Sequence, residues 1–328
     1  MRTLFLLFLS TLLFSGCDST NADADHDDDS LSPVEIHGQL RVEGNRIVDK
    51  NGDTVMLRGM SLFWSQWMGQ YYSATTVQWL REDWRVNVVR AAMGVHGGGY
   101  IENPDVEKRK VEIVIDAAID AGIYVIVDWH AHHPEAEAAA SFFAQIAAKY
   151  GDKPNIIYET WNEPLNTHDW ATVIKPYHES VVPEIRKHDP DNLIILGTQT
   201  WSQDVDKAAA EPVDFDNIAY ALHFYAGTHG ASLRAKAEAA LSKGVALMVT
   251  EWGTSEANGD GHLAVEETRV WLNFMDANEL SWCNWSVADK DEISAALLPG
   301  APGIGSWPDR MISASGLLVR EELREKNP

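Results

Sequence analysis

The sequence has few basic residues, only two cysteines, and no apolar run long enough to cross a bilayer. Its 26 lysines and arginines stand against 49 aspartates and glutamates, so the formal net charge at pH 7 is -23. This charge argues against nucleic acid, anionic membrane surfaces and polyanionic substrates as partners, because proteins bind phosphates through Lys and Arg. A neutral substrate fits the composition best.

The sequence also lacks the motifs of common metal and cofactor sites. Gly97-Gly98-Gly99 has no neighbouring Gly-Lys-Ser or Gly-Lys-Thr of a phosphate-binding loop. Asp27-Asp28-Asp29 has neither the spacing nor the closing glutamate of an EF-hand. We therefore expect no required metal and no cofactor. The 13 tryptophans exceed typical usage, and they fit either a Trp-rich core or flat platforms for sugar faces.

The first 32 residues differ in composition from the rest of the chain. Residues 1–17 carry one positive charge and a short apolar run, which predicts a signal peptide. They end in Phe14-Ser15-Gly16-Cys17, which resembles a bacterial lipobox, although leucine is more usual than Phe14 at that position. Cys17 is therefore the predicted lipidation site. Residues 18–32 are rich in aspartate and nearly free of apolar residues, which predicts a disordered acidic tether.

This N-terminal pattern determines the expected location. We expect the protein outside the cytoplasm, anchored by lipid on Cys17 to the outer membrane or cell surface of a bacterium, or secreted if Cys17 carries no lipid. Lipid on Cys17 leaves Cys283 without a disulfide partner, which predicts a buried free thiol. We expect a monomer that meets the membrane only through the lipid anchor.

Apolar, β-branched runs recur at regular intervals through residues 33–328: 54–57, 87–90, 123–127, 155–158, 193–196, 218–222, 245–249 and 280–282. Their continuous apolar character indicates strands buried on both faces, as in a parallel sheet. Helical patterns lie between them, for example at 106–121, 136–150 and 233–242. Eight strand–helix units predict a single (β/α)8 barrel, with 39–53 as a β-hairpin over its floor. A doubly wound open sheet is the alternative.

Polar and aromatic residues follow the predicted strands, where such barrels carry their active sites. The segments are Arg90, 128–130, 161–164, 199–201, 223–225, 250–253 and 282–285. Glu163 follows the fourth strand and Glu251 the seventh, so we expect them to face each other across the barrel mouth. Glycoside hydrolysis requires two carboxylates around one bond. For either glutamate alone, an ion pair with a neighbouring arginine is the alternative.

The ordered motifs resemble glycoside hydrolase family 5. They are Tyr158-Glu159-Thr160-Trp161-Asn162-Glu163-Pro164 and Val249-Thr250-Glu251-Trp252-Gly253. The similarity runs from about Gly59 to Leu298. It is closest to bacterial endo-1,4-β-glucanases, through residues 221–230, 281–286 and 289–292. The resemblance implies a retaining cellulase that hydrolyses internal β-1,4 bonds of cellulose and soluble β-glucans, with the polysaccharide as its partner.

The same resemblance implies roles for individual residues. Glu163 would be the general acid/base and Glu251 the nucleophile, with support from Arg90, His130, Asn162, His223 and Tyr225. The substrate would contact Trp67, Trp201, Trp285, Lys290 and Glu292. These roles require that the acid hold a proton near neutral pH while the nucleophile stays ionised, and Arg90 would favour the charged form of Glu251.

Two departures from the family pattern bear on substrate preference. Phe63 stands where a histidine is common, which removes a sugar hydrogen bond. Gly94 stands where an aromatic residue is common, which opens or reshapes the cleft. Xyloglucan, lichenan or mannan therefore remain alternative substrates.

Two alternatives come from other functional classes. His130, His132 and His133 could bind a metal in a barrel hydrolase. A silent glucan-binding lipoprotein would keep the tryptophans but lack turnover.

Overall fold

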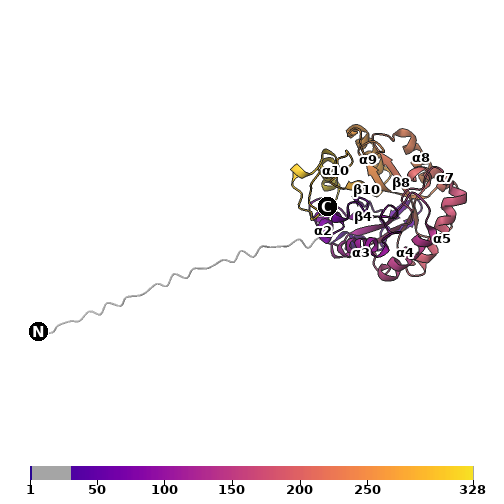
Figure 1. Ribbon diagram of the computed structural model, residues 1–328, viewed down its shortest axis with the longest axis horizontal. Coiled ribbons are helices and arrows are strands. Elements are labelled where there is room, and N and C mark those ends of the chain that lie inside the picture. The colour runs from indigo at the N-terminus through magenta and orange to yellow at the C-terminus, as the bar shows by residue number, and fades with distance from the viewer. Residues whose placement is uncertain (2–30, 328) are drawn as a thin grey trace. The chain divides into compact units, whose positions relative to one another are not determined.

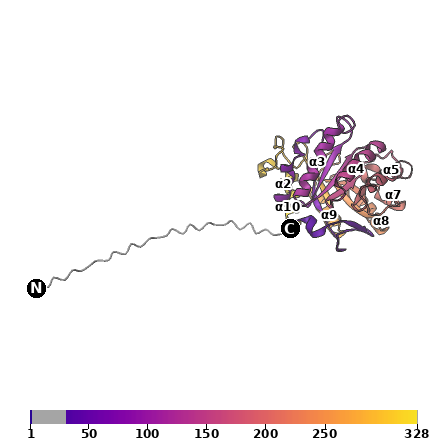
Figure 2. The same cartoon turned by 90° about the horizontal axis from the view of Figure 1, so that it is seen from below.

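The computed structural model describes Met1 and residues 31–327, and residues 31–327 form a closed barrel of parallel strands ringed by helices (Figure 1 and Figure 2). Cys17 lies outside the described residues. The strands close in the order β10-β3-β4-β5-β6-β7-β8-β9, which confirms the predicted (β/α)8 fold. Within residues 31–327, no helix combines the length and apolarity that a bilayer span needs.

The barrel strands are β3 (Arg58–Leu62), β4 (Val88–Gly94), β5 (Tyr124–His130), β6 (Ile156–Glu159), β7 (Ile194–Leu196), β8 (Ile218–Tyr225), β9 (Ala246–Gly253) and β10 (Trp282–Val287). The main helices are α2 (Ala74–Glu82), α3 (Pro104–Asp120), α4 (Ala136–Tyr150), α5 (Lys175–Arg186), α7 (Val205–Ala210), α8 (Ala231–Ser242), α9 (Val265–Ala277) and α10 (Ala314–Lys326). A short helix α1 (Pro33–His37) precedes the barrel and is capped by Ser32.

The core has two main parts, and their positions explain the apolar runs. One part fills the layer between strands and helices and includes Trp84, Trp129, Trp161, Trp252, Trp271, Trp282 and Trp307, all fully buried. The other part lies inside the lower barrel, where Ile126, Ile157 and Met248 pack with the buried free thiol of Cys283. Because strand residues contact one part or the other, both strand faces are apolar.

A two-stranded hairpin of β1 (Arg41–Glu43) and β2 (Arg46–Val48) covers the barrel floor, as predicted. Its Val42 N–H donates to Asn217 Oδ1 at 2.8 Å, just before β8 begins. The run 54–57 was predicted as the first barrel strand, and this is wrong, because β3 begins at Arg58. Val55 and Leu57 are apolar because they pack under the barrel beside the hairpin.

The barrel strands extend further toward their C-terminal ends than the apolar runs suggest. His130, His223, Tyr225, Glu251 and Trp285 all lie within strands rather than after them. Each of their backbones pairs with a neighbouring barrel strand, which places their side chains on a rigid part of the fold.

The short α6 (Gln199–Ser202) is a left-handed turn rather than an α-helix. Its φ angles are +62°, +53° and +56° at Thr200, Trp201 and Ser202. Two hydrogen bonds fix it: Ser202 Oγ donates to Asn162 O at 2.7 Å, and Trp201 N donates to Pro164 O at 2.8 Å. The turn thus ties Trp201 to the segment that carries Glu163.

Candidate active site

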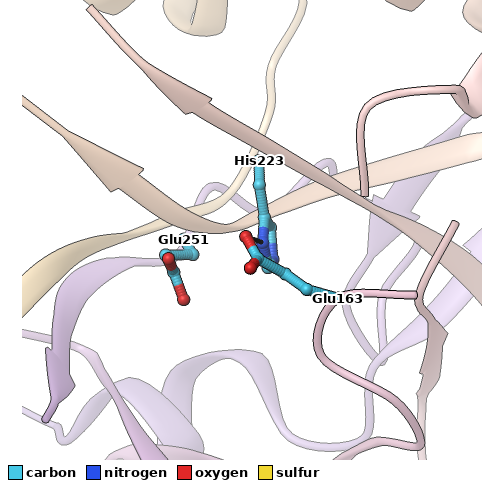
Figure 3. Close-up of side chains that lie close together, drawn as sticks. All are labelled: Glu163, His223 and Glu251. Carbon is cyan, nitrogen blue, oxygen red and sulfur yellow. Dashed lines mark hydrogen bonds and ion pairs between the residues drawn. The ribbon is translucent and has the colours of Figure 1, made fainter. Parts of the chain in front are cut away.

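The two glutamates and His223 meet at the C-terminal end of the barrel. Glu163 comes from the loop after β6, His223 from β8 and Glu251 from β9, and Figure 3 shows the His223 ring beside the carboxylate of Glu163. One ligand atom from each of the three residues lies within 4.8 Å of the other two. The predicted convergence of the two carboxylates is therefore seen in the structure.

Two donors hold the carboxylate of Glu251, whose side chain is only 5% exposed. Tyr225 Oη donates to Oε1 at 2.7 Å, and Arg90 Nη1 donates to Oε2 at 3.0 Å. Burial and the negative charge of Glu163 raise the pKa of Glu251 above its ordinary value. They outweigh His223, Arg90 and Tyr225, which favour the charged form.

Imidazoles occupy both oxygens of Glu163. His223 Nδ1 lies 3.0 Å from Oε1, and His132 Nε2 lies 3.2 Å from Oε2. Burial raises the pKa of Glu163, but the hydrogen bonds from His132 and His223 and their charges outweigh it, and the pKa falls to about 2. In the free site Glu163 is therefore a carboxylate that accepts hydrogen bonds from both imidazoles.

His223 donates from both ring nitrogens. Thr250 Oγ1 donates to Glu159 Oε1 at 2.6 Å, so it accepts from His223 Nε2 at 2.8 Å. Burial lowers the pKa of His223, but the nearby carboxylates of Glu159, Glu163 and Glu251 outweigh it and raise the pKa to about 9. The ring is therefore protonated at neutral pH.

Arg90 connects the buried polar groups and is itself fully buried. Its Nε donates to Glu159 Oε2 at 2.7 Å, and Nη2 lies 2.9 Å from Asp128 Oδ2. Nη2 also donates to Asn162 Oδ1 at 2.6 Å. Because Arg90 takes the amide oxygen of Asn162, the amide NH2 group is left to donate elsewhere.

His130 and Trp285 form a stacked pair beside the carboxylates. Their ring centroids are 5.1 Å apart with an interplanar angle of 3°. His130 Nδ1 lies 2.6 Å from Asp128 Oδ2. Burial and the charge of Arg90 hold the pKa of His130 well below its ordinary value, so the ring is neutral and donates from Nδ1 to Asp128.

Two hollows open from the carboxylate pair. One, of about 490 Å³, is lined by Trp201, and the other, of about 210 Å³, is lined by Trp67 and Trp285. Glu163 and Glu251 line both. Trp67 is 58% exposed and Trp201 is 37% exposed, in contrast to the core tryptophans. The tryptophan excess therefore serves both the core and the cleft.

The remaining predicted contacts lie at the edge of the second hollow. Lys290 Nζ lies 2.5 Å from Glu292 Oε2 and 5.4 Å from the centroid of the Phe63 ring. Phe63 is thus covered by a cation. Gly94 does not leave an open space, because a Cβ there would lie 1.7 Å from Gln66 Oε1. The side chain of Gln66 takes that space, and its Nε2 donates to His96 O at 3.1 Å.

The three histidines considered as metal ligands do not converge. His130 contacts Asp128, His132 contacts Glu163, and the ring of His133 lies 6.1 Å from that of His96. Among residues 31–327, the one three-residue group close enough to hold a metal is Glu163, His223 and Glu251. Within this group His223 bonds Glu163, and Glu251 is bonded by Arg90 and Tyr225, so the positive charges of His223 and Arg90 oppose a cation there.

Sequence reasoning assigned no role to several residues of the site. Glu159 and Asp128 are buried charges within apolar strands, and that position was a usable signal. His132 was considered only as a metal ligand. Trp64 had no signal, yet its ring lies 4.1 Å from that of His130.

A sequence model of the family "Cellulase (glycosyl hydrolase family 5)" matches residues 48–291. Endoglucanase A of Evansella cellulosilytica is 49% identical over 332 residues, which cover 99% of this chain and 66% of that protein. The chain thus spans about two thirds of this relative's length.

Solved structures are similar over nearly their whole length. A structure from Cytophaga hutchinsonii has 54% identity and a TM-score of 0.90, covering 90% of this chain and 97% of that one. The catalytic domain of Thermobifida fusca endoglucanase Cel5A, solved as a variant in complex with cellotetraose, has 34% identity and a TM-score of 0.85. That match covers 89% of this chain and 99% of the other.

Proposed function

The chain belongs to glycoside hydrolase family 5, its barrel is an endo-β-1,4-glucanase domain of that family, and we propose that the protein hydrolyses internal bonds of cellulose and soluble β-glucans with retention. The closeness of Glu163 and Glu251 carries this proposal, since one oxygen of each lies within 4.8 Å of the other. Retaining enzymes place these groups about 5 Å apart, whereas inverting enzymes separate them by about 6.5–9.5 Å to admit a water.

Glu251 is the nucleophile and Glu163 the acid/base in this proposal. Tyr225 and Arg90 orient the Glu251 carboxylate for attack on the anomeric carbon. Glu163 protonates the leaving oxygen and later takes a proton from water. Protonation of Glu163 removes a negative charge that raises the pKa of Glu251, so a neutral Glu163 helps to keep the nucleophile ionised.

The cleft supports cutting within a chain because hollows lie on both sides of the carboxylates. Asn162 offers its NH2 group to the 2-hydroxyl of the sugar at the cut, while His130 and Trp285 form the wall and floor of that sugar's site. Trp67 stacks sugars on the non-reducing side and Trp201 on the leaving side. Lys290 and Glu292 bond outer hydroxyls.

The experiment is reducing-end release from carboxymethylcellulose, barley β-glucan, xyloglucan and mannan, with anomeric NMR on cellotetraose. We expect activity on the first two, a β-configured first product, and loss of activity in Glu251→Ala. Activity on xyloglucan or mannan alone would change the assigned substrate but leave the proposed mechanism in place. An α-configured first product would refute the retaining assignment.

We also propose that lipid on Cys17 anchors a monomer to the outside of the bacterial envelope. The apolar leader, the lipobox-like ending and the acidic segment after it support this proposal. Expression in a Gram-negative host with labelled palmitate tests it. We expect label in the wild type and none in Cys17→Ser, whereas label in both proteins refutes the anchor. Size-exclusion chromatography of residues 31–328 tests whether the protein is a monomer, and elution at the mass of a dimer would refute this part of the proposal.

A further inference from the structure

The two imidazoles on Glu163 differ in their access to solvent. The side chain of His223 is 2% exposed, and both of its nitrogens are engaged, with Glu163 and with Thr250. The side chain of His132 is 38% exposed, whereas that of Glu163 is 14% exposed. His132 is therefore the partner of Glu163 that can exchange a proton directly with water.

The position of His132 is defined by contacts from separate elements. The ring of Trp64 meets it edge to face, with centroids 5.6 Å apart and an angle of 67°. The ionisable groups that act on it are Glu163, Glu251, His223 and His130. Burial lowers the pKa of His132, but the hydrogen bond and charge of Glu163 outweigh it, so the pKa is raised.

Acid catalysis needs a proton that the free site does not hold on Glu163. Glu163 Oε1 faces the buried His223, so Oε2 is the oxygen that a leaving group can reach from the cleft, and Oε2 is bonded to His132. A glycosidic oxygen that approaches Oε2 competes with this imidazole and weakens its hydrogen bond to the carboxylate. Weakening of that bond makes the carboxylate more basic and the imidazolium more acidic, which favours transfer of the proton from Nε2 to Oε2.

We propose that His132 is a positioning residue that acts through Glu163, holding the proton with which Glu163 protonates the leaving oxygen. The proposal rests on the acid/base role of Glu163. In the first step the Nε2–H bond of the His132 imidazolium breaks and an O–H bond forms on Glu163 Oε2, which then protonates the leaving oxygen. In the second step Glu163 takes a proton from water, and the lone pair on Nε2 of neutral His132 receives it. The proton count is restored after each turnover.

This arrangement has a consequence for the pH profile. When two groups share one proton, the pair loses it at a higher pH than either group would alone. Without His132, Glu163 has no solvent-exposed imidazole to hold the proton, because its other partner, His223, is buried and bonded at both nitrogens. The high-pH limb of kcat/KM, which reports loss of the acid's proton, should then move to lower pH by about one unit.

The test compares His132→Gln with the matched variant His133→Gln. The ring of His133 is exposed and neighbours those of His96 and His168 rather than Glu163. On cellotetraose, we expect the high-pH limb to fall by about one unit in His132→Gln and to stay in place in His133→Gln. On 2,4-dinitrophenyl β-cellobioside, whose leaving group needs no proton, His132→Gln should keep its rate of glycosyl-enzyme formation within about twofold. His132→Asn serves if His132→Gln does not fold.

An unchanged limb in His132→Gln, or an equal loss on both substrates at every pH, overturns the proposal. Glu163→Ala separates this outcome from failure of the proposed function. If Glu163→Ala retains activity on cellotetraose, the acid/base role and this inference fail together. If it loses that activity but still forms the glycosyl-enzyme from the activated substrate, while His132→Gln has the wild-type profile, this inference alone fails.

Discussion

Replacing Tyr225 by phenylalanine removes a single hydroxyl, and with it one of the two donors to the proposed nucleophile. Tyr225 Oη donates to Glu251 Oε1 at 2.7 Å, and the tyrosine side chain is buried in the apolar cluster that includes Phe63 and Trp285. The ring can therefore keep its packing in Tyr225→Phe. What is lost is a hydrogen bond to the charged form of Glu251.

The size of the effect follows from that one bond. A hydrogen bond to a charged group contributes about 1.5–3 kcal/mol, and one pKa unit corresponds to about 1.4 kcal/mol. The pKa of Glu251 should therefore rise by about one to two units. Because Glu251 must be ionised to attack, the acidic limb of kcat/KM should move to higher pH by the same amount.

The assay is the pH dependence of kcat/KM on cellotetraose for the wild type, Tyr225→Phe and a matched control, Tyr220→Phe. Tyr220 lies on the same strand, and its hydroxyl accepts from Val213 N at 3.0 Å, away from the carboxylates. The control should lose some stability but keep its acidic limb. An acidic limb that moves by less than about 0.3 unit in Tyr225→Phe would show that this bond does not control Glu251.

Two further predictions concern stability. The pKa of His223 is raised in the folded state to about 9 from 6.5, so the stability it contributes is complete below 6.5 and is lost as the pH rises through 9. Urea titrations should show the free energy of unfolding falling by about 3 kcal/mol between pH 6.5 and pH 10. The fall should be smaller in Glu163→Gln, because this variant removes one carboxylate partner of His223. An equal fall in the wild type and the variant would contradict this account. Thr250→Val should cost about 2–3 kcal/mol at pH 7 because it leaves buried partners of the hydroxyl unpaired. Thr268→Val is the matched control and should cost almost no stability, since the buried hydroxyl of Thr268 has no partner. Similar losses of stability in Thr250→Val and Thr268→Val would refute the proposed hydrogen-bond network around Thr250.

The parts of the fold that follow from pattern were predictable from the sequence. Continuous apolar runs identified six of the eight barrel strands, and the run 280–282 reached only the first residue of β10. The regular spacing of the runs indicated the closed barrel. The prediction of a strand at 54–57 was wrong because an apolar segment under the barrel floor has the same composition as a buried strand. Burial alone cannot separate the two, since the difference lies in which backbone groups pair.

The candidate site was predictable where a residue's chemistry matched its position at a strand end. Glu163 and Glu251 could be found in this way, but the hydrogen-bond network around them could not. The two imidazoles on Glu163 come from β8 and from the loop after β5, so their meeting depends on three-dimensional contacts. The same holds for Gln66, whose side chain fills the space beside Gly94 from a different loop.

In the left-handed turn that carries Trp201, the requirements of stability conflict with those of the proposed substrate contact. Three consecutive residues with positive φ cost roughly 1 kcal/mol each relative to a relaxed backbone. Glycine at any of them would relieve that cost. At 201 it would also delete the indole, and at 200 or 202 it would loosen the backbone that aims it. Selection for heat tolerance alone would therefore favour replacements in this turn, and such replacements would weaken the proposed stacking of Trp201 on the leaving half of the glucan. An engineered variant of this protein should be selected on polysaccharide turnover as well as on melting temperature.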